Sequence, residues 1–125
     1  MSDDRGTIAG AAAALRWGTV SAVELAEAAL AKIDANDERI GAYLALSSEI
    51  ARAAALEADR RFREDPDGAG PLCGIPVAIK DVLCLEGVET TAGSRILQGF
   101  IPPLHGHGCA ATCGRRGGRR REDEL

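Results

Sequence analysis

Apolar residues recur at helical spacing through the first half of the chain, and they predict three helices. The first is expected over residues 6–17, with Gly18 ending it. The second begins at Ser21 and Glu24, which form an S-x-x-E capping box, and it continues for about four turns. The side chains of this second helix that are expected to face the core are Val23, Ala26, Leu30 and Ile33.

The third helix is expected over residues 48–63, with Ser47 or Ser48 as its N-cap. Glu57 and Arg61 form a favourable i,i+4 ion pair on a face that is expected to meet solvent. The apolar side chains recur every four residues and form the predicted buried row, which consists of Ile50, Ala54, Ala58 and Phe62.

The pattern changes after residues 64–70, whose Pro, Gly and Asp content predicts a loop. GIPVAIKDV, residues 74–82, is a continuous apolar run with β-branched residues, and it predicts a buried strand that carries Lys80 near its end. Residues 40–46 fit either a buried turn or a strand, and residues 87–97 could hold a loop and a short helix. Helices that lead into a buried strand predict the front edge of an α/β domain.

Composition and charge narrow the possible functions. The chain has 125 residues, enough for one ordinary domain, with 15 basic and 19 acidic side chains. This acidic balance gives no electrostatic footprint for nucleic acid. No segment resembles a signal peptide or is apolar for long enough to span a bilayer, so we expect a cytoplasmic protein that does not bind membranes. Its cysteines should be reduced thiols, and Cys73 and Cys84 should be small buried hydrophobes.

Lys80 carries the most chemical information. A lysine at the end of an apolar strand must find an ionic partner or lose its charge, and a neutral amine can act as a general base. The competing interpretation is structural, because such a lysine can extend its ammonium group to solvent. The strand alone favours the structural interpretation.

The residues around Lys80 raise the catalytic interpretation. GPLCGIPVAIKDVLCLEGVETTAGSRILQGFIPP, residues 70–103, closely resembles the first signature block of the amidase signature family. Its G-I-P-x-A-I-K-D motif is followed at the right interval by T-T-A-G-S and F-x-P-P. The helical part matches too, so the resemblance covers roughly residues 6–103. It is greatest to the A subunits of aspartyl/glutamyl-tRNA amidotransferases. The fold that it implies is α/β, with N-terminal helices leading into the first strand of the family's mixed sheet, here cut short.

The resemblance implies amide hydrolysis by a Ser–Ser–Lys triad, with Lys80 as the general base. Both serines of that triad are absent from this chain, because Ser94, the only serine after Lys80, matches the T-T-A-G-S segment and is expected to be a turn residue. The substrate would be glutamine or another small amide.

The implied partners are the B and C subunits of the amidotransferase. ATP and Mg²⁺ would be used by the partner subunit, tRNA would be engaged only indirectly, and this chain itself would hold no cofactor. A stand-alone amidase acting on another small amide, and a non-catalytic fragment that docks a partner subunit, remain alternatives.

The sequence departs from the family after Pro103. Reading the tail codons one base later permits YTATVV…AAGAVVVGKTN, which is similar to the family's continuation. We therefore expect residues 1–103 to be the N-terminal part of an amidase-signature domain, and residues 104–125 to be an out-of-frame, disordered tail produced by a frameshift. The 125-residue chain alone should then be inactive.

Two other interpretations of the tail are weaker. A zinc site is not expected, because the spacing of its histidines and cysteines does not match a known closed site. The ligands of such a site would be His105, His107, Cys109 and Cys113. A nucleic-acid-binding arm is not expected either, because three acidic residues follow the arginines and no aromatic residue is interleaved.

Overall fold

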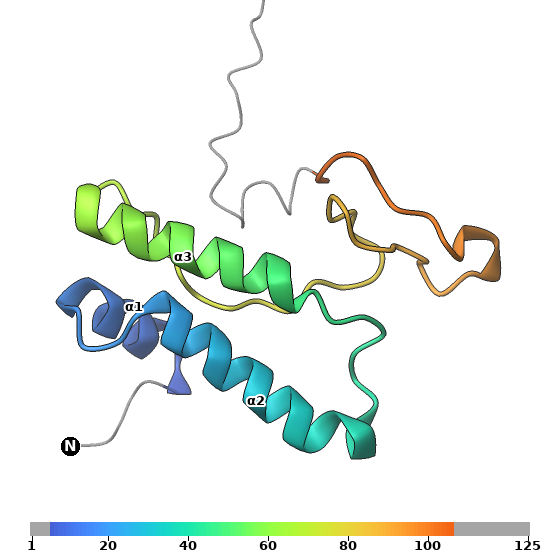
Figure 1. Cartoon of the computed structure of the whole chain (residues 1–125), viewed down its shortest axis with the longest axis horizontal. Helices are drawn as coiled ribbons and strands as arrows, with labels where there is room; N and C mark the ends of the chain where they lie inside the picture. The colour runs from blue at the N-terminus through green and yellow to red at the C-terminus, as the bar shows by residue number, and fades with distance from the viewer. Residues whose placement is uncertain (1–5, 107–125) are drawn as a thin grey trace, which may run out of the picture. The chain divides into compact units, whose positions relative to one another are not determined.

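The computed structural model describes residues 6–106. The chain divides into two compact units, Met1–Ala78 and Ile79–Leu125. The regular elements of the described residues are α1 (Ile8–Trp17), α2 (Ala22–Ile40), α3 (Ser48–Glu64) and a short 3-10 helix, η2 (Arg95–Leu97) (Figure 1). None of the helices among these residues is long and apolar enough to cross a membrane.

Helix α1 forms where the sequence predicts it, because its two ends are capped locally. The Thr7 hydroxyl accepts a hydrogen bond from the amide of Gly10 at 3.0 Å. Gly18 ends the helix in the left-handed conformation, with φ of 71°, and its amide donates to the carbonyl of Leu15 at 3.2 Å. The expected helix over residues 6–17 is therefore confirmed, beginning two residues later than expected.

Helix α2 begins with the predicted capping box. The Ser21 hydroxyl accepts from the amide of Glu24 at 3.0 Å, and the Glu24 carboxylate accepts from the amide of Ser21 at 2.8 Å. The helix runs for 19 residues, about five turns rather than four. Ala26 is buried as expected and so is Ala22, whereas the larger predicted core residues Val23, Leu30 and Ile33 are only half-buried.

Helix α3 also forms as predicted, but its buried face is shifted by one position. Ala58 is buried as expected, whereas Ile50 and Ala54 are exposed and Ala55 is buried instead. A row that repeats every four residues drifts by about 40° at each step, since a helix has about 3.6 residues per turn. The mixed spacing of Ala51, Ala55, Ala58 and Phe62 stays on one face, and this face packs on α2.

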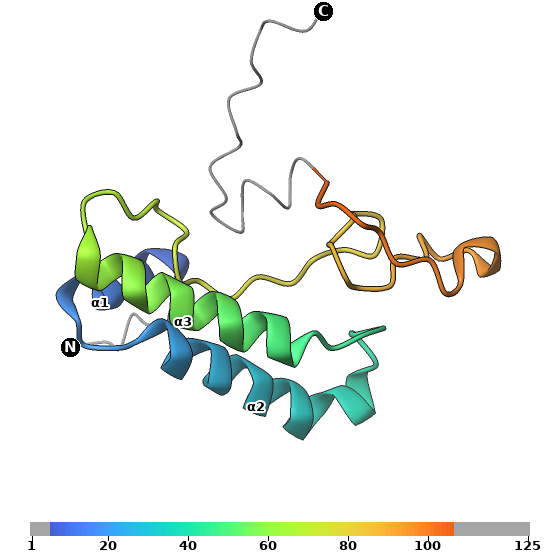
Figure 2. The ribbon, with the colours of Figure 1, turned by 45° about the horizontal axis from the view of Figure 1, so that its top comes forward.

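The core of the first unit lies between the helices and is built largely from alanine. Helices α2 and α3 run antiparallel and lie side by side (Figure 2), which the small side chains permit. The buried cluster consists of Leu15, Ala22, Ala26, Ala55 and Ala58. The partly buried hydrophobic residues packed against it are Val20, Val23, Leu25, Phe62, Cys73 and Ile75. The segment just after the α3 loop therefore closes the core.

The expected α/β fold is wrong for the part of the chain that the structure describes, because every regular element in residues 6–106 is helical. Residues 75–80, the centre of the expected strand, have no regular secondary structure. A strand needs a neighbouring strand to receive its backbone hydrogen bonds, and residues 6–106 supply none. Val77 is 49% exposed, so the apolar run is not buried here.

Residues 40–46 were expected to be a buried turn or strand, and the burial is wrong. Helix α2 ends at Ile40, and the loop that follows exposes Leu44 by 79% and Leu46 by 52%. The apolar composition of this loop indicated burial, but no other described element packs over it deeply enough to bury it. The loop predicted over residues 64–70 is confirmed.

The second unit is made of turns that are joined by hydrogen bonds between distant residues. Its backbone pairs include Thr90 N with Phe100 O at 3.0 Å, Gly87 N with Pro102 O at 3.2 Å, and Gly106 N with Cys84 O at 2.8 Å. Leu85, Thr90 and Pro102 are its buried residues among those described. The loop and short helix predicted for residues 87–97 are confirmed, the helix being η2. Residues 107–125, most of the predicted out-of-frame tail, lie outside the described residues, so that prediction stays untested.

Candidate functional site

Lys80 lies at the beginning of the second unit, in a turn. Its carbonyl accepts a hydrogen bond from the amide of Leu83 at 2.9 Å, and its side chain is exposed. Within residues 6–106 no side chain forms a hydrogen bond or an ion pair with its ammonium group. The apolar surroundings expected from a buried strand are therefore not present around this lysine. Its position depends on the backbone that carries it.

Asp81, the next residue, binds the T-T-A-G-S segment. Its carboxylate accepts one hydrogen bond from the amide of Thr91 at 2.8 Å and a second from the Thr91 hydroxyl. Its backbone carbonyl accepts from the amide of Ala92 at 3.0 Å. We call this group, Asp81 with Thr91 and Ala92, the Asp81 clamp. It closes a loop between residues that are ten positions apart.

The hydrogen bonds of the clamp favour the ionised carboxylate. The side-chain hydrogen bond from Thr91 is the main cause that lowers the pKa of Asp81 below its usual value, followed by the amide of Thr91, with a further contribution from the amide of Gly93. Hydrogen bonds to an ionised acceptor are stronger than those between neutral groups. The clamp is therefore formed with Asp81 charged at neutral pH.

The backbone on the Thr91 side of the clamp is unusual. Ala92 has φ of 49°, a left-handed conformation that costs a residue with a Cβ atom about 1–2 kcal/mol. Gly93 follows with φ of 71°, and its amide donates to the Thr91 hydroxyl at 3.2 Å. Ser94 then caps η2, since its hydroxyl accepts from the amide of Ile96 at 3.2 Å. The predicted turn role of Ser94 fits this geometry.

Sequence reasoning identified Lys80 but missed the Asp81 clamp. The available signal was an acidic residue directly after Lys80, together with two threonines on the other side of a Gly-containing turn. That signal does not say which threonine turns toward the carboxylate. Thr90 is buried, and its amide bonds to the carbonyl of Phe100. Only the turn geometry decides that Thr91 binds Asp81.

The remaining candidate groups form no second reactive site among the described residues. Cys73 and Cys84 are free thiols and half-buried, and burial raises the pKa of the Cys73 thiol. His105 accepts a hydrogen bond through Nδ1 from the amide of Glu86 at 3.1 Å. Within residues 6–106 no three His, Cys, Asp or Glu side chains gather as metal ligands would. His107, Cys109 and Cys113 of the rejected zinc site lie outside the described residues.

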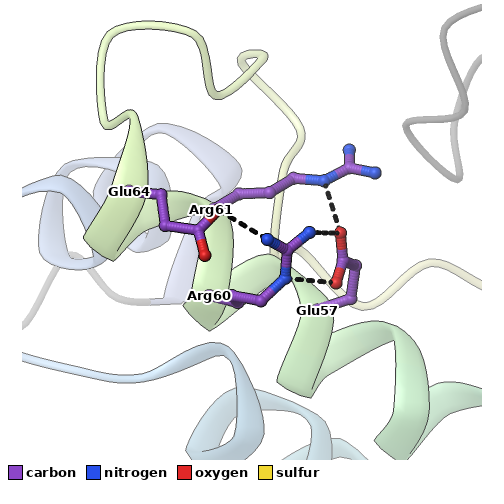
Figure 3. A network of polar contacts seen from close by, with 4 residues as sticks. All are labelled: Glu57, Arg60, Arg61 and Glu64. Carbon is purple, nitrogen blue, oxygen red and sulfur yellow. Dashed lines mark hydrogen bonds and ion pairs between the residues drawn. The ribbon is translucent and has the colours of Figure 1, made fainter.

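The densest polar network lies on the exposed face of α3 and has a structural role. Arg60 and Arg61 both bind the carboxylate of Glu57, and Arg60 also reaches Glu64 (Figure 3). The predicted ion pair of Glu57 with Arg61 is thereby confirmed, at 3.2 Å. Hydrogen bonds from Arg60 and then Arg61 lower the pKa of Glu57 to about 2. All four side chains are substantially solvent-exposed, so this network supports the helix and holds no poised acid or base.

Comparison with known proteins identifies relatives for most of the chain. The family model described as Amidase matches residues 24–109. Over 99 residues the chain is 56% identical to the A subunit of the glutamyl-tRNA(Gln) amidotransferase of Chloroflexus aurantiacus, and the match covers 79% of this chain and 20% of that protein.

Proteins of the same name from other bacteria match as well. The one from Anaeromyxobacter sp. (strain K) is 51% identical over 84 residues, covering 67% of this chain and 17% of that protein. The one from Streptomyces avermitilis is 46% identical over 97 residues, covering 78% and 19%. The chain thus spans about a fifth of the length of these relatives. No solved structure matches it significantly.

Proposed function

This chain belongs to the amidase family, as its signature motif indicated, and on that basis we propose that the whole protein hydrolyses the side-chain amide of glutamine, with Lys80 as the general base. The observation that carries the proposal is the 56% identity over 99 residues to an A subunit of glutamyl-tRNA(Gln) amidotransferase. The matched stretch includes the G-I-P-x-A-I-K-D motif that contains Lys80.

The proposed chemistry moves one proton and one acyl group. The neutral amine of Lys80 accepts a proton that is relayed from the nucleophilic serine through a bridging serine. The deprotonated hydroxyl attacks the amide carbonyl carbon, the carbon–nitrogen bond breaks, and the proton goes to the leaving ammonia. Water then hydrolyses the acyl-serine ester and releases the acid. The exposed, unpaired side chain of Lys80 fits a base whose serine partners lie outside the described residues.

The partners follow from the same relatives. Their name, which makes each of them one lettered subunit of an amidotransferase, supports an assembly with further subunits, which we take to be the B and C subunits. The released ammonia would be used by the partner subunit, with ATP and Mg²⁺, to amidate the misacylated tRNA. In this proposal the A subunit touches tRNA only indirectly and needs no cofactor of its own.

Two alternatives remain. A stand-alone amidase for another small amide would share the family model and Lys80. A non-catalytic docking fragment is favoured by the apolar end of α2, where Ile40 and Leu44 are exposed. A hollow of about 370 Å³ lies there, lined by Ala29, Lys32, Ile33, Asn36, Asp37, Ile40, Ala42 and Tyr43.

The test grafts this chain onto a full-length relative. The stretch of the Chloroflexus aurantiacus A subunit that matches this chain is replaced by the corresponding residues of this chain, and ammonia release from glutamine is measured with the other subunits present. We expect turnover by the graft. Lys80→Ala should lower turnover by a factor on the order of 10⁴–10⁶, because members of a catalytic triad act as a unit. The 125-residue chain alone should show no turnover.

The control is Lys32→Ala, which changes an exposed lysine on α2 and should leave turnover unchanged. Near-normal turnover by the Lys80→Ala graft would refute the role of Lys80. Hydrolysis of simple amides but not of glutamine would instead favour the stand-alone amidase.

A further inference from the structure

The Asp81 clamp fixes the backbone on the C-terminal side of Lys80 at two levels. The carboxylate of Asp81 binds the amide and hydroxyl of Thr91, and the carbonyl of Asp81 binds the amide of Ala92. Both oxygens of the carboxylate are used, so the side chain cannot rotate without losing a bond. The residue bonded to Lys80 is therefore held by side chain and main chain together.

The clamp also holds a strained residue in place. Ala92 has φ of 49°, and its amide is the donor to the Asp81 carbonyl. Such conformations persist only where the surroundings over-determine them, and they gather at functional sites. Here the surroundings are the bonds from Asp81 on one side and Gly93 with φ of 71° on the other. The free energy of the clamp thus exceeds the cost of the strain.

A general base must be held to within about 0.5 Å of its productive position. Lys80 has an exposed side chain with no partner among the described residues, so its order must come from its backbone. We propose that Asp81 is a positioning residue for Lys80, and that the two hydrogen bonds from Thr91 to its carboxylate fix the turn that carries the lysine. The inference rests on the proposed function only in giving Lys80 a catalytic task, since the clamp itself is independent of that task.

The experiment uses the complete 125-residue chain and measures backbone order at Lys80 by ¹⁵N relaxation. In the unchanged protein the order parameter of the Lys80 amide should be near 0.85, the value of a rigid backbone. Asp81→Ala should lower it below about 0.6, the range of flexible segments. Thr91→Val removes one of the two bonds and should give an intermediate value, whereas Thr91→Ser keeps both donors and should restore the order.

Two measurements separate positioning from a general loss of structure. Glu89→Gln alters the carboxylate that accepts from Gly99 in the same unit, and it should leave Lys80 ordered. Far-UV circular dichroism of every variant should keep the helical signal of α1, α2 and α3.

Unchanged order at Lys80 in Asp81→Ala would overturn the inference, as would an equal loss in Glu89→Gln or a failure of Thr91→Ser to restore order. None of these results depends on turnover, so the inference and the proposed function fail separately.

Discussion

At the scale of single residues, Gly74 shows why the G-I-P motif begins with glycine. Its φ is 78°, and a Cβ atom there would lie 3.0 Å from Cβ of Ala22 and 3.1 Å from Cδ1 of Leu15. The first value excludes residues with side chains on conformational grounds, and the distances exclude them on packing grounds. This glycine lets the segment before Lys80 pass close over the core of the first unit.

We therefore predict that Gly74→Ala destabilises the first unit by about 2–4 kcal/mol, combining left-handed strain with overpacking. Urea unfolding followed at 222 nm measures the change. Gly70→Ala is the matched control, because a Cβ atom there would have nothing within 4 Å and its φ is not in the left-handed region. The control should stay within about 0.5 kcal/mol of the unchanged protein. Equal stability of the two variants would show that the close approach at Gly74 relaxes at no cost.

The same scale marks how far the candidate site could be predicted. Lys80 stands out in sequence because a charge within an apolar run requires an explanation. Asp81 does not stand out, because an acidic residue at a turn is common, and its value depends on a threonine that is ten residues away. A pairing of this kind is set by the turn at Ala92, whose left-handed φ no local preference predicts.

At the scale of elements, the start of α2 is held by local and distant groups together. Ser21 and Glu24 supply the capping box, and the carboxylate of Asp59 on α3 accepts from the amides of Ala22 at 2.7 Å and Val23 at 3.2 Å. These amides belong to the first turn and have no partner inside the helix. The negative charge also meets the positive end of the helix dipole. Asp59 thus joins α3 to α2 through α2's unsatisfied donors.

Asp59→Ala should cost about 1–2 kcal/mol of unfolding free energy, as for the loss of a good helix cap. The expected loss is larger than for an exposed acid because two amides lose their acceptor at a partly buried position. Asp34→Ala, at an exposed site on α2, is the control and should change the free energy by less than about 0.5 kcal/mol. Thermal unfolding at pH 7 gives both numbers. A loss no greater than that of the control would mean that water replaces the carboxylate without cost.

The elements also show why helices were predicted and the strand was not observed. Capping and i,i+4 pairs lie within one segment, so Ser21, Glu24 and the pair Glu57–Arg61 could be identified directly from the sequence. A strand depends on hydrogen bonds to another segment, and residues 75–80 find none within the described part of the chain. Which alanine of α3 is buried depends likewise on α2, and a simple four-residue repeat selects Ala54 where packing selects Ala55.

At the scale of the whole molecule, the hydrophobic cluster is confined to one of the two units. Its buried members run from Leu15 to Ala58, and the partly buried residues packed on it extend only to Ile75. The first unit, Met1–Ala78, therefore contains every residue of this core. Isolated helices as short as α1 are marginal in water, so the three helices depend on this shared core for their stability.

We accordingly predict that residues 1–78, expressed alone, keep α1, α2 and α3. The ellipticity per molecule at 222 nm should match that of the full chain, because the helices among the described residues, apart from the single turn of η2, lie in this unit. The unfolding free energy should agree within about 0.5 kcal/mol, the spread expected for changes away from a core. Gly74→Ala placed in the fragment is the internal check, since it should destabilise the fragment as much as the full chain if the same core forms in both. Loss of the helical signal on excision would contradict this, because it would mean that stabilisation of the helices comes from beyond residue 78 and that the alanine-rich core is too small to hold them.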